Sequence, residues 1–176
     1  KLAIDSNDYV YTTSVDNTVR KIDPSGTQEW KFTDANTLYG VDIDLNGNVY
    51  IGAQNGSVRK INSSGNEVTT GGWPFTGHTS GVYAIAIDHI NNYIYTGSYD
   101  QVIRKIDFNG YEVTTGGWPF TNFAGRIWEI SVDNNTNSIY TACYDNTVKR
   151  ISFGGNELWS FNGFTDKTLG IATYKP

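Results

Sequence analysis

A phrase that opens with tyrosine recurs four times along the chain, and this repeat constrains the fold more than any other feature. It reads YTTSVDNTVRKID from Tyr11, YIGAQNGSVRKIN from Tyr50, YTGSYDQVIRKID from Tyr95 and YTACYDNTVKRIS from Tyr140. The tyrosines are spaced 39, 45 and 45 residues apart. Repeats of this length are structural units that bury their hydrophobic faces only by stacking on one another.

Each unit is predicted to contain four short β-strands. Runs rich in Val, Ile, Thr and Tyr alternate with turn-forming clusters such as LNGN, NNTN and DPSG. No stretch shows the apolar spacing of an amphipathic helix, so the predicted fold class is all-β. Antiparallel four-stranded units of this length are typical of β-propeller blades. We expect one propeller domain or partial propeller over residues 1–176, with repeats at about 1–37, 38–81, 82–126 and 127–167.

The stretch TLGIATY, residues 168–174, is one strand more than four complete units need. It follows Trp159 at the same spacing that separates Trp73 from Asp88, so it corresponds to the innermost strand of a fifth unit. A four-bladed ring closed by pairing its two termini has no place for this strand. We therefore expect part of a larger propeller, or an array completed by self-association with another chain. A closed four-bladed ring is the alternative.

Residues 77–107 carry the features of one known repeat in the sequence GHTSGVYAIAIDHINNYIYTGSYDQVIRKID: a Gly-His pair, an apolar inner strand and a Ser-x-Asp turn. They resemble a WD repeat in which Ile106-Asp107 stands in place of the family's Trp-Asp pair. The resemblance implies a hydrogen-bond network through His78, Ser98 and Asp100 that lacks the tryptophan donor. It implies the propeller fold, whereas activity has to be argued from a site.

The turn after the third strand also resembles the quinoprotein-type repeat Asp-x-x-Gly-x-x-x-Trp, most clearly at Asp23, Gly26 and Trp30. The enzymes of that family carry an adjacent cysteine pair and larger propellers. This chain has a single cysteine, Cys143, at a position where the other units have small residues. We expect an inert buried thiol there.

Neither histidine is predicted to act in catalysis. His78 occupies the Gly-His position of the repeat, and His89 lies in a turn without a counterpart in the other units, so we expect it to be solvated. Nucleophile elbows, zinc-binding helix motifs and phosphate-binding glycine loops are absent from the sequence. The net charge of -5 disfavours a nucleic-acid partner, and no apolar run is long enough to span a membrane. We predict a protein that is not an enzyme and needs no cofactor or metal.

Four aspartates stand in register at the ends of the predicted inner strands: Asp5, Asp44, Asp88 and Asp133. In one interpretation they form a ring of carboxylates that binds a cation at one end of the channel, with calcium suggested by the D-x-N-x-N spacing. In the other, each accepts backbone hydrogen bonds in the tight turn that follows it. Turn sequences such as IDLNGN favour the second, and the later Gly and Glu of a calcium loop are missing.

Basic pairs occupy equivalent places on the third strand of every unit: Arg20-Lys21, Arg59-Lys60, Arg104-Lys105 and Lys149-Arg150. Adjacent strand residues face opposite ways, so each pair contributes one cation to each side of its blade. We expect ion pairs within or between blades, with Asp16, Asp100 and Asp145 as acidic partners. The alternative is a basic ring that binds an anionic ligand, which the net negative charge does not favour.

Large aromatic residues recur at two positions of the unit. In WD-repeat propellers, the residue that opens the inner strand and the residue before the Ser-x-Asp aspartate tend to lie on one face, which commonly binds partners. The first position holds Tyr39, Tyr83 and Trp128; the second holds Val15, Gln54, Tyr99 and Tyr144. We predict a partner-binding site made of Tyr39, Tyr83, Tyr99, Trp128, Tyr144 and Arg126. The alternative is that some of these rings only pack between blades.

Two functions of different classes fit these features. The first is a non-enzymatic scaffold for protein-protein interaction, for instance in a surface or virion assembly, which favours an extracellular or virion-associated location. The second is a lectin-like module, which the two comparable pairs Tyr83 with Tyr99 and Trp128 with Tyr144 keep open. A third alternative is a propeller hydrolase or lyase, which needs a cluster of His and carboxylate groups at the channel mouth.

The stretch EVTTGGWPFT occurs twice without a difference, at Glu67–Thr76 and at Glu112–Thr121. In the first unit the glutamate directly precedes the tryptophan, so both copies carry a local insertion ahead of it. We interpret them as outer-strand segments of a recently duplicated blade. We expect Trp73 and Trp118 to pack at blade edges; ligand binding at the outer rim is the alternative.

Overall fold

The computed structural model describes residues 1–173, and within them it contains fifteen strands and no helix. The first sheet contains β1 (Leu2–Ile4), β2 (Val10–Thr13), β3 (Thr18–Ile22) and β4 (Gln28–Thr33). The second contains β5 (Leu38–Ile43), β6 (Val49–Ala53), β7 (Val58–Ile61) and β8 (Glu67–Val68). The third contains β9 (Val82–Asp88), β10 (Tyr93–Ser98) and β11 (Ile103–Asp107), and the fourth contains β12 (Ile127–Asp133), β13 (Ser138–Cys143), β14 (Val148–Ser152) and β15 (Glu157–Phe161). The predicted all-β class is confirmed.

Every sheet is an antiparallel meander in which consecutive strands pair. The third sheet has three strands, and its outer edge is formed by isolated bridges from Ile103 to Phe120 and from Ile106 to Glu112. The second sheet has a short fourth strand, β8, and a similar bridge from Val58 to Phe75. Both units carry the VTTGG insertion, which interrupts the outer strand and lets the chain rejoin the sheet only after the Trp-Pro pair.

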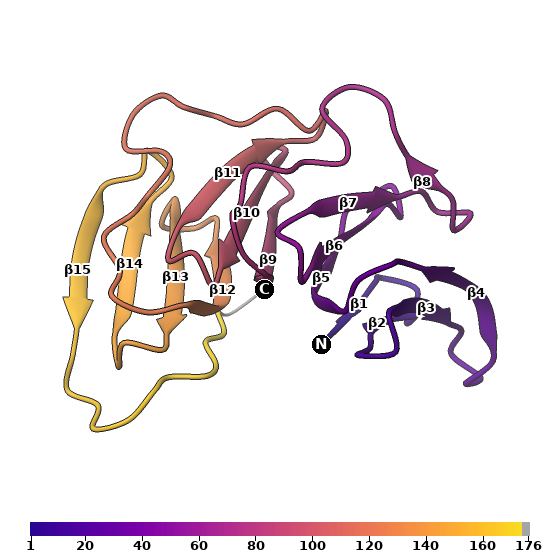
Figure 1. The fold of residues 1–176 in the computed structure, drawn as a ribbon, viewed down its shortest axis with the longest axis horizontal. Helices are drawn as coiled ribbons and strands as arrows, with labels where there is room; N and C mark the ends of the chain where they lie inside the picture. The colour runs from indigo at the N-terminus through magenta and orange to yellow at the C-terminus, as the bar shows by residue number, and fades with distance from the viewer. Residues whose placement is uncertain (174–176) are drawn as a thin grey trace.

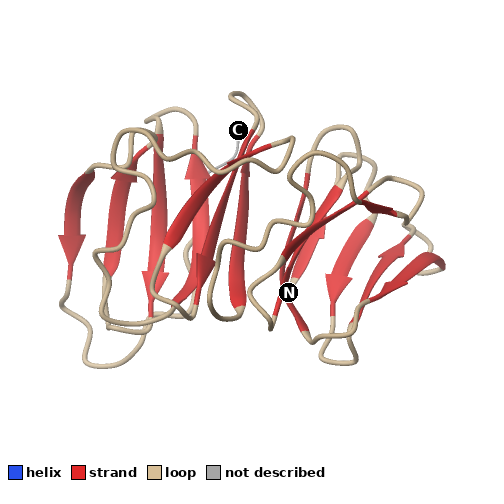
Figure 2. Cartoon of the chain, turned by 45° about the horizontal axis from the view of Figure 1, so that its top comes forward, coloured by secondary structure: helices blue, strands red, loops and turns tan. Residues whose placement is uncertain are grey.

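The sheets stand in an arc like the blades of a propeller (Figure 1). The inner strands β1, β5, β9 and β12 lie toward the middle of the arc, and β4, β8 and β15 lie at its periphery. In the turned view, loops gather at both ends of the strands (Figure 2). The Lys1 ammonium links the first and fourth blades across the middle, because it donates to the Trp128 carbonyl at 2.6 Å and to the Glu129 carboxylate at 2.7 Å.

The hydrophobic core consists of three clusters, one between each pair of successive blades. Three of the four repeated tyrosines lie in these clusters, one in each, and are fully buried: Tyr11, Tyr50 and Tyr95. Tyr50 packs in one cluster with Ile85 and Ile87 of the next inner strand. Because burying such a side chain contributes about 1.5–3 kcal/mol, the repeated contact between neighbouring blades is a major source of stability.

The two copies of EVTTGGWPFT fasten each blade to the next. The Trp73 and Trp118 indoles donate to the carbonyls of Phe108 at 3.2 Å and Phe153 at 2.9 Å, and both acceptors belong to the following blade. At Gly117, the second glycine of the later copy, a Cβ would collide with the carbonyl of a glycine in the next blade. The predicted edge packing of the two tryptophans is confirmed, and the glycine pair is explained by the close approach of two backbones.

Residues 168–173 lie where the sequence predicts a fifth inner strand. The Thr173 N–H donates to the Ser131 hydroxyl at 3.1 Å, and the Ile87 N–H donates in the same way to the Asp42 carboxylate at 2.9 Å. The segment therefore contacts β12 as β9 contacts β5. It is not assigned to a sheet, and Tyr174 of the predicted strand lies outside the described residues.

Candidate functional site

Three aromatic rings form a continuous stack across three blades. Each ring belongs to the second residue of an inner strand: Tyr39 in β5, Tyr83 in β9 and Trp128 in β12. Equivalent positions on adjacent inner strands bring them together. The centroids of Tyr39 and Tyr83 are 4.4 Å apart with an interplanar angle of 14°, and those of Tyr83 and Trp128 are 5.3 Å apart at 19°. Stacked geometry of this kind holds each ring in place and lowers the entropy lost when a ligand binds.

A second pair of rings lies beside this stack. Tyr99 and Tyr144 follow β10 and β13, and their centroids are each 6.4 Å from a ring of the stack, Tyr83 and Trp128 respectively. Tyr99 is 52% exposed and Tyr144 is 37% exposed. Both rings thus present contact area to solvent while one side rests on a neighbouring ring.

Arg126 joins the two groups of rings. Its guanidinium carbon lies 3.9 Å from the Tyr144 ring centroid, 5.1 Å from that of Trp128 and 5.3 Å from that of Tyr99. Such distances allow cation–π attraction to several rings at once. The structure therefore brings all the predicted site residues together in one surface, which we call the aromatic face: Tyr39, Tyr83, Tyr99, Trp128, Tyr144 and Arg126.

The aromatic face is asymmetric around the arc. Its charged end lies between the third and fourth blades, whereas the equivalent turn positions of the first two blades hold the exposed Val15 and Gln54. Tyr39 extends the stack toward the second blade without a second ring beside it in the turn of that blade. A single graded surface of this kind differs from a set of equivalent sites, one in each blade.

A shallow pocket of about 250 Å³ opens at the charged end, between Tyr99 and Tyr144. Gln101 and Arg126 line it together with the backbone around Gly125. The sequence missed one contributor, because Lys167 lies in the loop after β15 and yet its ammonium is 5.0 Å from the Tyr144 ring centroid.

The environment of the two outer tyrosines differs from that of the stack. A hydrogen bond from Lys167, and to a smaller extent one from Arg126, lowers the pKa of Tyr144. Burial within the stack raises the pKa of Tyr83 instead. Two cations, Arg126 and Lys167, thus lie beside Tyr144, whereas the rings of the stack are packed on one another.

A buried hydrogen-bond network fixes the third blade, as the WD-like pattern implies. His78 Nδ1 lies 2.9 Å from the Asp100 carboxylate, and His78 Nε2 lies 2.8 Å from the Thr96 hydroxyl. The expected direct role of Ser98 is wrong, because its hydroxyl donates to the Ser80 carbonyl at 2.9 Å and contacts the network only by accepting the Asp100 N–H. The arrangement holds a turn and lies apart from the aromatic face.

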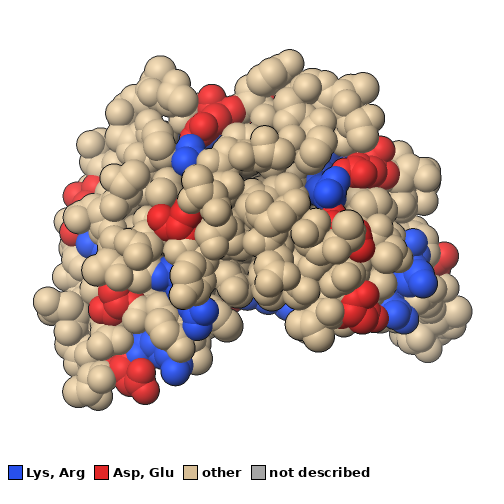
Figure 3. Space-filling view, viewed as in Figure 1, with Lys and Arg blue, Asp and Glu red and all other residues tan. Residues whose placement is uncertain are grey.

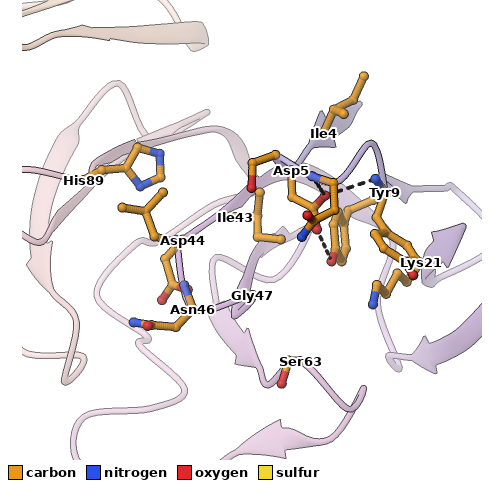
Figure 4. Close-up of a pocket in the computed structure, with 14 residues that line it drawn as sticks. Ile4, Asp5, Tyr9, Lys21, Ile43, Asp44, Asn46, Gly47, Ser63 and His89 are labelled. Carbon is orange, nitrogen blue, oxygen red and sulfur yellow. Dashed lines mark hydrogen bonds between the residues drawn. The ribbon is translucent and has the colours of Figure 1, made fainter. Parts of the chain in front are cut away.

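The inner-strand aspartates are held in turns, and two of them line a hollow of about 320 Å³ (Figure 4). The Asp5 carboxylate accepts the N–H groups of Asn7 at 2.9 Å and Tyr9 at 3.0 Å, and the Tyr11 hydroxyl at 3.0 Å. Asp44 is held in the same manner by its own turn. The turn interpretation is confirmed. In the described part of the chain, no cluster of three or more His, Cys, Asp or Glu side chains could hold a metal ion.

Two residues with potentially reactive side chains, His89 and Cys143, are enclosed by their surroundings. His89 lines the same hollow and is half-buried, so the expectation of a solvated residue is wrong; the turn after β9 folds its ring toward the turn that follows Asp44. The Cys143 thiol is buried and donates to the Gly125 carbonyl at 3.2 Å, and burial raises its pKa to about 12. Because the thiolate is the reactive form, this cysteine is inert at neutral pH, as predicted.

The basic pairs are neutralised within and between blades. Ion pairs join the third and fourth strand positions at Lys21–Glu29, Arg59–Glu67, Arg104–Glu112 and Lys149–Glu157. Lys60 and Lys105 reach the next blade, where they donate to the carbonyls of Phe108 and Phe153 at 3.1 Å each. Cationic and anionic side chains are accordingly interspersed on the face drawn in Figure 3. This arrangement argues against a basic ring that binds an anionic ligand.

The acidic partners of these pairs are predicted wrongly at two of three positions. Arg20 pairs with Asp16 at 3.0 Å, as expected. Asp100 contacts His78 instead, and Asp145 accepts hydrogen bonds from the backbone and hydroxyl of its own turn. A carboxylate just after a strand is close to turn N–H groups, which reach it before a neighbouring basic side chain does.

Comparison with known proteins agrees with this architecture. The family model described as "WD domain, G-beta repeat" matches residues 65–107, which include the third sheet and the turn before it. The fold is a WD-like propeller arrangement of blades. No curated protein matches the chain. Of the solved structures that match, one is the crystal structure of the computationally designed Ika8 protein, with a TM-score of 0.79, 18% identity and coverage of 99% of this chain.

The likeness to Ika8 concerns the fold alone at this identity. The chain spans about half the length of that protein, since 52% of it is covered. Residues 1–173 contain no helix that could span a membrane.

Proposed function

We propose that this protein is a non-enzymatic scaffold that binds a protein partner through the aromatic face. WD repeats generally mediate protein-protein interaction, and the match at residues 65–107 supports that class of function. The observation that carries the proposal is the continuous stack of Tyr39, Tyr83 and Trp128 with Arg126 at one end. Tyrosine, tryptophan and arginine are the residues most enriched among those that dominate interface energies.

The geometry also supports tight binding at modest cost. The three rings already stack on one another in the free protein, so little side-chain freedom remains to be lost on association. Removing a central aromatic anchor from such a surface costs about 2 kcal/mol or more in binding free energy. Trp128 is the central candidate, because it contacts Tyr83, Tyr144 and Arg126.

Selection of displayed random peptides on the purified chain tests the proposal. We expect the enriched peptides to bind the parent chain and to lose at least about tenfold in affinity for Trp128→Ala. Tyr111→Ala is the control, because Tyr111 is an exposed aromatic residue that lies just after β11 and outside the aromatic face. Peptides that bind the two variants equally well, or a selection that enriches nothing, would contradict the aromatic face as a docking site.

Glycan binding is the second candidate, because flat aromatic rings also stack on sugars. The graded face, with its cation at one end only, favours the protein partner over a lectin with equivalent sites in several blades. A glycan array probed with the chain separates the two. We expect no signal that depends on Tyr83 or Trp128. A signal lost in Trp128→Ala would make the lectin the better proposal. A role in a surface or virion assembly requires a protein partner, so it depends on the same result.

A further proposal concerns the two ends of the arc, where we infer that a second copy of residues 1–176 docks. Leu2 and Ile4 of β1 are 63% and 57% exposed, and Trp159 of β15 is 42% exposed. Equivalent residues between the blades are buried against each other. An end face of one copy thus offers the apolar groups that a blade of another copy buries.

A further inference from the structure

We propose that the pocket at Arg126 binds a carboxylate of the partner, namely an acidic side chain flanked by an apolar residue that lies on the aromatic stack. This inference rests on the proposed function and names the chemistry that the face selects. Among the described residues, no carboxylate pairs with the Arg126 guanidinium, which lies in a pocket walled by Tyr99 and Tyr144.

Arg126 differs from the other arginines in its partners. Arg20, Arg59 and Arg104 each form an ion pair with a carboxylate, and Arg150 donates from Nε to the Ser138 hydroxyl at 3.1 Å. Among the described residues no carboxylate lies within ion-pair distance of Arg126, and its Nε is enclosed without an acceptor. Its contacts are instead the surrounding rings, of which Tyr144 is the nearest.

A second cation lies close to the pocket. The Lys167 ammonium is 5.0 Å from the ring centroid of Tyr144, which lines the pocket. Asp145, the nearest acidic residue of the adjacent turn, is used by the Ala124 N–H at 3.0 Å and by the Thr147 side chain. Arg126 and Lys167 thus place two cations beside this pocket in a chain with a net charge of -5, and together they attract an anionic group.

The shape of the site favours a carboxylate over other anions. Four rings surround the Arg126 guanidinium at 3.9–5.6 Å, and a ligand reaches its N–H edge through the pocket between Tyr99 and Tyr144. A planar carboxylate matches that edge with two parallel hydrogen bonds. A phosphate, in contrast, is usually held by several cations or by a row of backbone N–H groups. The stack beside the pocket then covers the apolar neighbour of the acidic residue.

A pair of peptides that differ only in charge tests the proposal. The probes are acetyl-Leu-Glu-Phe-amide and acetyl-Leu-Gln-Phe-amide, each titrated into the ¹⁵N-labelled chain and followed through the backbone and Arg126 Nε–H resonances. We expect a dissociation constant on the order of 1 mM for the Glu peptide and about tenfold weaker binding of the Gln peptide. Arg126→Gln should abolish the difference. Arg150→Gln, the control at a distant arginine, should retain it.

Each outcome decides the matter. Equal affinity for the two peptides, the same preference in Arg126→Gln, or no shift with either peptide overturns the carboxylate pocket. Tighter binding of inorganic phosphate than of the Glu peptide also overturns it. If displayed peptides still require Trp128 while Glu and Gln bind equally, this inference fails and the proposed function stands. If displayed peptides do not require Trp128, the proposed function itself fails.

Discussion

The same structural unit has different surroundings in the middle of the arc and at its ends. Trp73 and Trp118 are 5% and 4% exposed, because the following blade covers them and accepts their indole hydrogen bonds. Trp159 holds the equivalent place in the fourth blade and is 42% exposed. The sequence around these tryptophans is similar. The difference shows that the neighbouring blade, and not the strand itself, determines how deeply such a residue is buried.

The first blade shows the same effect on its opposite side. Leu2 and Ile4 are exposed, whereas their counterparts on the other inner strands are buried: Val41, Ile43, Ile85, Ile87, Ile130 and Val132. Each buried pair contacts the preceding blade, as Ile85 and Ile87 contact Tyr50. Stability should therefore depend strongly on residues at the three internal contacts and weakly on the same residue types at the ends.

The largest expected contrast is between Trp118→Ala and Trp159→Ala. Removal of the buried indole should lower the free energy of unfolding by about 3–5 kcal/mol, through lost burial and the cavity that remains. Removal of the exposed indole should cost less than about 1 kcal/mol. Urea denaturation followed by circular dichroism measures both. Similar costs for the two variants would mean that Trp159 is covered in solution.

A smaller contrast is expected between Gly117→Ala and Gly170→Ala. A Cβ at Gly117 meets the Gly155 carbonyl of the next blade, whereas nothing lies within 4 Å of a Cβ at Gly170. We expect the first substitution to cost about 1–3 kcal/mol, as overpacking does, and the second to change stability by less than about 0.5 kcal/mol. The same denaturation experiment applies. A neutral Gly117→Ala would show that the two backbones can separate without loss.

The His78–Asp100 contact predicts a pH-dependent difference between the third blade and the first, which lacks this histidine. Burial alone would raise the pKa of Asp100, but hydrogen bonds from His78 and from backbone N–H groups lower it on balance. A lowered folded-state pKa gives stability that is present above the unfolded pKa and is lost as the pH falls through the folded one. Asp100→Asn should therefore cost about 1–3 kcal/mol at pH 7, and the cost should shrink below about pH 4.

Asp16→Asn in the first blade is the control for that measurement. Asp16 forms an exposed pair with Arg20 at 3.0 Å and accepts hydrogen bonds from Thr18, so it has turn contacts like those of Asp100 without the histidine. If the stability of Asp100→Asn and that of the parent chain fell in parallel down to pH 3, the histidine contact would not account for the lowered pKa of Asp100.

The aromatic face could be predicted because it depends on register alone. Tyr39, Tyr83 and Trp128 share one position of the unit, and equivalent positions on adjacent inner strands must meet once the blades stack. Lys167 could not be found in this way, because it lies in a loop whose path no repeat specifies. The partners of Asp100 and Asp145 failed for another reason. Sequence distance does not tell whether a carboxylate is reached first by its own turn or by a basic side chain.

The smallest effect on stability is expected at the first end of the arc, from Leu2→Glu with Ile4→Glu. Because both side chains are exposed, the double substitution should change the free energy of unfolding of a single chain by less than about 0.5 kcal/mol. The substitution Ile43→Glu, at the buried counterpart of Ile4, should prevent folding, since it places an unpaired charge between two blades.

Sedimentation velocity tests whether a second copy covers this end face. If a second copy covers the end face, the parent chain sediments as a dimer and the double variant as a monomer, because charged groups there oppose association. A parent chain that sediments as a monomer at all concentrations would show that the exposed end face does not bind another copy.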